Sequence, residues 1–299
     1  MLNRLPLRIH CWGGLGSQLY AWALYEKILA KKPKKNIKIV LHTSGVTRRT
    51  SELNSIFGCR QLVIVDDFKS SAPETNLDLT RENKLVFQSL FAKLHSITIR
   101  LIKRSLFFSH LISDCETDSG VNRIRPWTIS IRGHYSKLQI TSEIFQRMYK
   151  RAVDVDFVFL KVNSNLKHQL AIHYRLGDLL TLSSKSYLDP IRISHCLANL
   201  KNDYAVVLSD SPAVAIEFIS RNTKDMNFHY RDLDIWETVR LLISTDIFIG
   251  TPSKISEWVS LIRLYFGDMK GIIYLPYEMQ PQMNRIIVDP INCSKINYY

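Results

Sequence analysis

Residues 169–178 read Gln-Leu-Ala-Ile-His-Tyr-Arg-Leu-Gly-Asp, and this stretch decides the fold class. A short apolar run followed by alternating polar residues and a glycine is typical of a buried strand that ends at the edge of a parallel sheet. Because side chains alternate along a strand, His173 and Arg175 share one face. Ligands of such sheets bind beyond the carboxyl ends of the strands. The stretch therefore predicts an α/β sheet and a ligand site at its edge.

The residues after this stretch alternate between short β-branched runs and helical patterns. With Gln169–Tyr174, strands are predicted at Tyr204–Leu208, Met226–Tyr230, Ile247–Gly250 and Gly271–Leu275. Helices are predicted between them at Ile191–Leu200, Pro212–Arg221, Ile235–Ser244 and Lys254–Phe266. Five strands alternating with helices predict a parallel sheet of the nucleotide-binding type.

The first half of the chain shows the same alternation. Strands are predicted at Pro6–Trp12, Ile37–Leu41, Leu62–Val65 and Trp127–Arg132, and helices at Gln18–Ala30, at Arg49–Phe57 and after Thr141-Ser142-Glu143. A length of 299 residues suits two domains of about 150 residues each. We therefore expect an N-terminal domain over residues 1–155 and a C-terminal domain over residues 156–299.

Composition restricts the class of protein and its compartment. With 46% hydrophobic and 22% charged residues, the chain is neither disordered nor collagenous. No run approaches the roughly 18 apolar residues of a membrane span, and residues 1–8 lack the apolar core of a signal peptide. The cysteines are scattered without a CxxC pair, at Cys11, Cys59, Cys115, Cys196 and Cys293. We expect reduced thiols and a cytoplasmic location.

The charge of the chain favours anionic partners. Forty Lys and Arg residues against 27 Asp and Glu residues give a net charge of +13, which attracts nucleic acid, phosphorylated substrates or an acidic membrane surface. No acidic residue occurs between Glu82 and Asp114, where basic and apolar residues predict one or two amphipathic helices. Such helices either pack on a core with a solvated basic face or bind a membrane or a lipid-linked substrate.

A second candidate site lies at Trp12-Gly13-Gly14-Leu15-Gly16-Ser17-Gln18-Leu19, between a predicted strand and a predicted helix. Glycines let backbone N–H groups approach an anion, and a helix N-terminus favours negative charge. The spacing is not a dinucleotide-binding fingerprint, because Leu19 stands where the third glycine is required. The stretch is therefore either a phosphate-binding loop or a tight β–α turn.

Polar residues at the other strand ends extend the first candidate site. These residues are Asp210, Asp232, Asp234, Ser253 and Ser256. The pair Asp232 and Asp234, and also Ser253, precede predicted helices and could equally be N-caps. Arg175 could likewise form a structural ion pair with Asp178 instead of holding a phosphate. Because the Asp-Leu-Asp sequence opens a helix, no metal site is expected there.

The order of these blocks resembles the bacterial alpha-1,2-fucosyltransferases. The blocks are Gly-Gly-Leu-Gly-Ser-Gln-Leu (13–19), His-Tyr-Arg-Leu-Gly-Asp (173–178), Leu-Ser-Asp (208–210), Leu-Asp-Ile (233–235) and Ser-Thr-Asp (244–246). More broadly, the chain is similar to the superfamily that includes alpha-1,6- and protein O-fucosyltransferases. Two blocks depart from the family pattern: Ser17 replaces an Asn, and an Asn-Ser-x-Phe-Ser-Trp-Trp block is reduced to residues 250–258.

The resemblance implies a GT-B fold, in which two Rossmann-like domains face a central cleft and the C-terminal domain binds a GDP-sugar. It also implies that the sugar is transferred with inversion at the anomeric carbon, and that the reaction needs no metal or other cofactor. Arg175 would hold the donor β-phosphate, with His173 and Asp178 as further catalytic residues. The donor-binding residues would be Gly14, Gly16, Gln18, Asp210, Asp234, Ser253 and Ser256. The base for the acceptor hydroxyl stays open among His173, Asp178, His10 and Asp67.

The sequence thus predicts a glycosyltransferase of carbohydrate metabolism that transfers fucose from GDP-fucose to a surface-polysaccharide oligosaccharide such as bacterial O-antigen. A lipid-linked acceptor would place the cytoplasmic enzyme peripherally on the cytoplasmic face of the inner membrane, in contact with anionic lipid. Two alternatives remain, a transferase of the same fold with another nucleotide sugar and a non-catalytic protein that binds polyanions. Nucleic acid is not an expected partner, because no recognised nucleic-acid-binding module appears.

Overall fold

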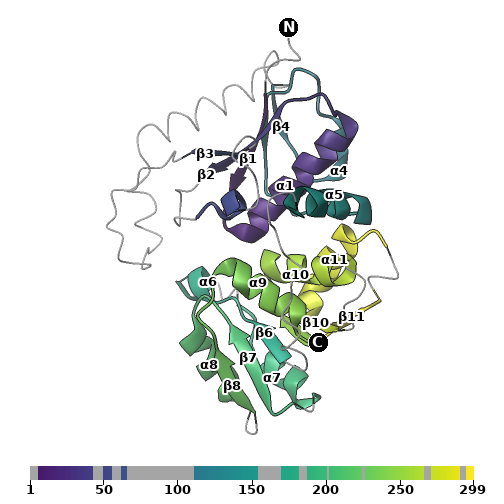
Figure 1. The fold of residues 1–299 in the computed structure, drawn as a ribbon. Helices are drawn as coiled ribbons and strands as arrows, with labels where there is room; N and C mark the ends of the chain where they lie inside the picture. Colours follow the sequence, from purple (N-terminus) through teal and green to yellow (C-terminus); the bar gives the residue numbers. More distant parts are fainter. Residues whose placement is uncertain are drawn as a thin grey trace. The chain divides into compact units, whose positions relative to one another are not determined.

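Two parallel sheets, each with helices packed on it, make up the computed structural model of the chain (Figure 1). The structure describes residues 6–42, 50–55, 62–65, 111–153, 170–181, 187–200, 202–223, 226–265, 271–289 and 294–299. The chain divides into two compact units, Met1–Val158 and Phe159–Tyr299. The expected α/β class, with a Rossmann-like parallel sheet in each of two units, is confirmed.

The first unit is built on a five-stranded parallel sheet in the order β3-β2-β1-β5-β4. Its strands are β1 (Leu7–Trp12), β2 (Ile37–His42), β3 (Leu62–Val65), β4 (Ile112–Asp114) and β5 (Ser130–Arg132). Its helices are α1 (Leu15–Lys31), α4 (Asp118–Asn122) and α5 (Ser142–Val153), with a 3-10 turn η2 (Glu52–Ser55). The long helix α1 packs on β1, β2 and α5, which buries Trp22 completely.

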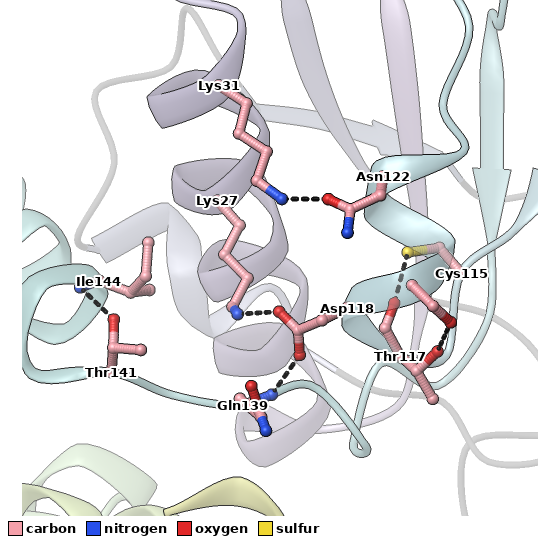
Figure 2. Close-up of polar contacts among 10 residues, drawn as sticks. Lys27, Lys31, Cys115, Thr117, Asp118, Asn122, Gln139, Thr141 and Ile144 are labelled. Atoms are coloured by element: carbon pink, nitrogen blue, oxygen red, sulfur yellow. Dashed lines mark hydrogen bonds and ion pairs between the residues drawn. The ribbon is translucent and has the colours of Figure 1, made fainter. Parts of the chain in front are cut away.

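Lysines of α1 hold the segment after β4 against that helix (Figure 2). Lys27 forms an ion pair with Asp118, and Lys31 donates a hydrogen bond to Asn122. The other carboxylate oxygen of Asp118 accepts from the backbone N–H of Gln139 at 2.8 Å. Two further lysines reach backbone carbonyl oxygens: Lys32 that of Ile124 at 2.5 Å, and Lys35 that of Pro126 at 2.8 Å. These four lysines, at positions 27, 31, 32 and 35, therefore contribute to packing within the unit.

The second unit is built on a six-stranded parallel sheet in the order β11-β10-β9-β6-β7-β8. Its strands are β6 (Leu170–His173), β7 (Tyr204–Leu208), β8 (Asn227–Tyr230), β9 (Ile247–Gly250), β10 (Ile272–Leu275) and β11 (Ile296–Tyr298). Its helices are α6 (Gly177–Thr181), α7 (Pro190–Ala198), α8 (Pro212–Ser220), α9 (Ile235–Ser244), α10 (Lys254–Tyr265) and α11 (Gln280–Ile286), with a 3-10 turn η4 (Tyr277–Met279). The core of this unit includes Leu170, Ile172, Ile193, Val207 and Ile249.

Arg263 of α10 binds the end of α9 from inside the second unit. The last carbonyl groups of a helix lack partners within the helix and must find them elsewhere. The Arg263 guanidinium donates to the carbonyl oxygens of Leu242 (2.9 Å), Ile243 (3.1 Å), Thr245 (2.7 Å), Asp246 (3.2 Å) and Ile272 (3.4 Å). Burial lowers the pKa of Arg263 to about 10, where the group is still charged near neutral pH. A Cβ on Gly271 would lie 1.8 Å from Nη2 of Arg263, so glycine is required beside the guanidinium.

Several segments differ from the sequence predictions. In place of the predicted helix Arg49–Phe57, the described residues form the 3-10 turn Glu52–Ser55. The predicted strand Trp127–Arg132 begins only at Ser130. The strand β11 and the helix α11 were not predicted. The basic helices predicted before Asp114 fall largely on residues 82–110, which are outside the part of the chain that the structure describes. Within the described ranges, no helix is both long and apolar enough to cross a membrane.

Candidate functional site

The carboxyl ends of three neighbouring strands bring the candidate residues of the second unit together. β6 lies between β7 and β9, and His173 at its end is in register with Leu208 and Gly250. Asp210 stands two residues after Leu208, and Thr251 directly follows Gly250. This is the edge at which parallel sheets of this kind bind their ligands.

Thr251 holds the chain where it leaves β6. Its Oγ1 donates to the carbonyl oxygen of His173 at 2.9 Å and accepts from the backbone N–H of Arg175 at 3.0 Å. One buried hydroxyl thus satisfies two backbone groups at the end of the strand. Thr251 was not predicted as a site residue, because a threonine after a strand does not by itself indicate a hydrogen-bond partner 76 residues away.

Asp210 fixes the next two residues of the same turn. Its Oδ1 accepts from the backbone N–H groups of Leu176 at 2.9 Å and Gly177 at 2.8 Å. A Cβ on Gly177 would lie 2.0 Å from Oδ2 of Asp210, so this close approach requires glycine. Asp210, which the sequence predicts as a donor-binding residue, therefore holds the backbone at the start of α6.

Arg175 supplies a cation at this edge. The residue follows β6, and its backbone lies between the contacts made by Thr251 and Asp210. Its side chain is half-buried. A guanidinium group is always charged and presents several N–H donors in one plane, which suits the oxygens of a phosphate. Asp178, the other predicted catalytic residue, is the second residue of α6, and its side chain lies outside what the structure describes.

The ring of His173 lies against two serine hydroxyls. Its Nδ1 is 2.9 Å from Oγ of Ser256 and 3.3 Å from Oγ of Ser253. Burial lowers the pKa of His173 to about 4; the Arg175 charge also lowers it, and Asp210 acts in the opposite direction. The ring is therefore neutral near pH 7, and Arg175 rather than His173 carries positive charge here.

Both serines belong to the start of α10. Oγ of Ser253 accepts from the backbone N–H of Ser256 at 3.0 Å, which confirms the N-cap alternative for Ser253. The same hydroxyl donates to Oγ of Ser256 at 3.1 Å. Ser256 has no exposed surface and Ser253 has 8%. The two hydroxyls thus form one buried network with His173.

Asp234 is exposed at the start of α9. Its Oδ1 accepts from the backbone N–H of Glu237 at 2.7 Å, and Oε2 of Glu237 accepts from the backbone N–H of Asp234 at 3.1 Å. These reciprocal bonds form a capping box, so the N-cap alternative is confirmed for Asp234. Asp232 is exposed before the cap. Among the residues that the structure describes, no group of three or more His, Cys, Asp or Glu side chains could hold a metal ion.

The glycine-rich stretch of the first unit forms the turn between β1 and α1. Gly13 has a φ of +110°, a conformation that favours glycine. Gly14 is the N-cap of α1, and a Cβ on it would meet nothing within 4 Å. Gly16 is buried in the first turn of the helix. The stretch therefore forms a tight β–α turn, which is one of the two predicted alternatives. Because Gly14 has no side chain, the space beside its backbone at the start of α1 is open.

Gln18 locks this turn against a following segment. Its Nε2 donates to the carbonyl oxygens of Gly13 at 3.1 Å and Thr50 at 2.8 Å. Its Oε1 accepts from the backbone N–H of Leu53 at 3.1 Å. The side chain is 2% exposed. Gln18, also predicted to contact the donor, therefore uses its amide group to position the glycine turn.

Comparisons with known proteins give matches among solved structures. Neither a protein family nor a curated protein matches the sequence. The fucosyltransferase NodZ from Bradyrhizobium is 13% identical, with coverage of 86% of this chain and 92% of that chain and a TM-score of 0.37. The E. coli heptosyltransferase WaaC with ADP is 8% identical, with coverage of 98% and 96% and a TM-score of 0.45.

A third similar structure is not a transferase by its description. It is a putative UDP-N-acetylglucosamine 2-epimerase from Listeria monocytogenes, 10% identical, with coverage of 93% of this chain and 82% of that chain and a TM-score of 0.42. At these identities and TM-scores, what the chain does has to be inferred from its own residues.

Proposed function

We propose that the chain is a glycosyltransferase that transfers fucose from GDP-fucose to a hydroxyl group of an oligosaccharide, with inversion at the anomeric carbon and without a metal ion. The observation that carries the proposal is Arg175, a cation at the carboxyl end of β6 whose backbone is held by Thr251 and Asp210. The resemblance of the sequence blocks around residues 13–19 and 173–178 to fucosyltransferases supports the choice of donor.

The chemistry of the leaving group explains why a fixed cation matters. As the bond between the sugar and the nucleoside diphosphate lengthens, negative charge grows on the β-phosphate and positive charge grows on the sugar ring. A guanidinium that is already positioned stabilises the growing phosphate charge more than it stabilises the bound donor. Arg175 would serve in this way the purpose that a metal ion serves in other transferases.

His173 would act beside the nucleotide as a neutral hydrogen-bonding group. Its low pKa, caused by burial, excludes an imidazolium near neutral pH. Ser253 and Ser256 are positioning residues in this proposal, because their hydroxyls set the orientation of the ring. Asp210 is a positioning residue as well, through its bonds to the backbone that follows Arg175.

Two further positions are proposed to bind the donor, one in each unit. Asp234 is exposed at the N-terminus of α9, where its carboxylate could accept from the N–H groups of guanine in addition to capping the helix. In the first unit, the open space at Gly14 lets a polar ligand approach the backbone at the start of α1. Asp178, three residues after Arg175 in the sequence, stays a proposed catalytic residue.

We propose a lipid-linked oligosaccharide of O-antigen or capsule assembly as the acceptor. The net charge of +13 and the basic, apolar composition between Glu82 and Asp114 support a peripheral contact with anionic lipid on the cytoplasmic face of the inner membrane.

The test of the donor is thermal-shift binding of GDP, UDP, CMP and GDP-fucose, each with and without EDTA. It is carried out on the wild type, on Arg175→Ala and on the control Arg240→Ala, which removes an exposed arginine of α9 in the same unit. We expect stabilisation by GDP and GDP-fucose that survives EDTA, is lost in Arg175→Ala and is kept in Arg240→Ala.

Other outcomes would point to the alternatives. Selective stabilisation by UDP or CMP would indicate another nucleotide sugar. No response to any nucleotide, together with binding to nucleic acid that weakens steeply with salt, would indicate a polyanion-binding protein. Equal loss of binding in Arg175→Ala and Arg240→Ala would contradict the role assigned to Arg175.

A further inference from the structure

Two short turns of the first unit lie at the amino ends of its strands. In the lysine turn, which leads into β2, the backbone N–H of Lys35 donates to the carbonyl oxygen of Lys32 at 3.0 Å. In the tryptophan turn, which leads into β5, the backbone N–H of Thr128 donates to the carbonyl oxygen of Arg125 at 3.1 Å. Because β2 and β5 are the two neighbours of β1 and all three strands are parallel, both turns stand at the same edge of the sheet.

Both turns present a proline and the residue after it to solvent. Proline presets the backbone angle that the second position of a tight turn requires, and Pro33 and Pro126 stand at this position. The next residue is Lys34 in the lysine turn and Trp127 in the tryptophan turn, and all four residues are exposed, Trp127 by 41%. The hydroxyl of Thr128, which is 1% exposed, accepts from the first backbone N–H of the tryptophan turn at 3.0 Å. A buried side chain therefore fixes the turn that exposes the ring.

Lysine side chains join the two turns. Nζ of Lys32 donates to the carbonyl oxygen of Ile124 at 2.5 Å, and Nζ of Lys35 donates to that of Pro126 at 2.8 Å. A carbonyl oxygen is a neutral acceptor, so these bonds place the ammonium groups without cancelling their charge. The lysine turn and the tryptophan turn thus lie side by side and form one surface.

Positive charge accumulates on this surface. The basic residues of the two turns and of the positions just before them are Lys31, Lys32, Lys34, Lys35, Arg123 and Arg125. No acidic residue occurs at positions 30–37 or 119–129. Lys31 also has a neutral partner, the side-chain oxygen of Asn122 (Figure 2). Burial lowers the pKa of Lys32, and the charge of Lys35 lowers it further. A bound anion would relieve this repulsion.

An exposed apolar tip among cations matches the boundary of an anionic bilayer. Tryptophan rings locate at the level of the lipid headgroups, and lysine and arginine bind the phosphates there. The two exposed prolines offer no N–H group to a base or a phosphate, which favours lipid over nucleic acid as the partner. The surface lies at the edge opposite to the carboxyl ends of the strands, where such sheets bind ligands. A bilayer at the turns would therefore leave the ligand-binding edge of this unit uncovered.

We propose that the lysine turn and the tryptophan turn together form the surface with which the first unit docks on an anionic lipid bilayer. Trp127 enters the boundary between headgroups and acyl chains, and the six basic side chains bind headgroup phosphates. This inference rests on the peripheral membrane contact of the proposed function and names a surface that makes it.

The first test is sedimentation with vesicles of equal parts phosphatidylglycerol and phosphatidylcholine, without donor or acceptor. It compares the wild type with Lys34→Gln/Arg125→Gln and with the control Lys137→Gln/Lys150→Gln, which removes two other exposed basic residues of the same unit. Both variants have the same net charge. We expect the partition coefficient to fall by about 30-fold in the first variant and by less than about 3-fold in the control. Equal losses, or full binding by the first variant, would overturn the surface.

The second test measures the depth of the tryptophan ring. Tryptophan fluorescence is followed while the protein binds vesicles whose phosphatidylglycerol carries bromine in its acyl chains. Trp22, Trp236 and Trp258 are buried in the protein, so we expect strong quenching in the wild type and little in Trp127→Phe, which still sediments with the vesicles. Equal quenching in the two proteins would overturn the place given to Trp127.

Further outcomes separate this surface from the donor site and from another partner. Stabilisation by GDP-fucose, measured in parallel, should be equal in the wild type and in Lys34→Gln/Arg125→Gln. No stabilisation of either protein would contradict the proposed donor, while the vesicle results would still decide the surface. A wild type that binds a double-stranded DNA oligonucleotide and no vesicles would overturn the lipid surface.

Discussion

At the scale of single residues, the surroundings of His173 decide what this histidine can do. Its ring is enclosed at the end of β6, with Ser256 and Ser253 at hydrogen-bond distance. A charged ring would lose hydration there and would stand beside the Arg175 charge. Burial therefore lowers the pKa of His173 to about 4, and the ring is uncharged in the folded protein over the physiological pH range.

The unfolding free energy should consequently depend on pH through His173. The folded pKa of about 4 lies below the ordinary value of 6.5, so the unfolded chain binds more protons between these values. Stability should then fall as the pH decreases from 6.5 towards 4, with no contribution from His173 above that range. Urea unfolding at pH 7, 5.5 and 4.5 should give a shallower fall for His173→Asn than for the wild type. Parallel curves for the two proteins would contradict the assigned cause.

At the scale of elements, the ion pair between α1 and α4 carries more energy than the neighbouring exposed contact (Figure 2). Lys27 is 8% exposed and binds Asp118, whereas the contact of Lys31 with Asn122 is exposed. Lys27→Met should lower the unfolding free energy by about 2 kcal/mol, because it leaves a partly buried carboxylate without its cation. Lys31→Met should change it by less than about 0.5 kcal/mol. Guanidinium chloride unfolding distinguishes the two, and equal effects would contradict this ranking.

Most elements of the second unit could be predicted because their runs are apolar, β-branched and bounded by polar turns. The predicted strand Ile247–Gly250 and helix Ile235–Ser244 have the observed bounds. Three-residue strands such as β11 have too few residues to show an alternation of side chains. In place of the predicted helix at Arg49–Phe57, the described residues form a shorter 3-10 turn, in which the backbone N–H of Leu53 donates to the side chain of Gln18.

The candidate site was predictable in its residue types and not in its contacts. The histidine, the arginine and the following glycine stand in one short block of sequence, which is why a strand-end site could be expected there. The clamp by Thr251 and the network of Ser256 with His173 join residues 76 and 83 positions apart. The contact of His42 with His10 was not predicted for the same reason, because the two residues lie on different strands. Contacts of this range follow from strand order, which a single sequence does not reveal.

At the scale of the whole molecule, the net charge of +13 should decide where the protein accumulates. We expect it to sediment with phosphatidylglycerol vesicles in 50 mM NaCl and to be released as NaCl rises to 300 mM, because attraction between a basic surface and anionic lipid is screened by salt. Phosphatidylcholine vesicles are the matched control. Sedimentation with neither lipid, or retention at high salt on both, would contradict an electrostatic membrane contact.

The buried guanidinium of Arg263 also constrains how this sequence can diverge. The group serves five carbonyl oxygens from the end of α9 to β10, and lysine, with its point-like charge, could not reproduce that planar set of donors. Gly271 has room for no side chain while Arg263 stands beside it. A Cβ at this glycine would also lie 2.7 Å from the backbone carbonyl oxygen of Asp246, so the glycine should persist in descendants of this chain even where the arginine is replaced.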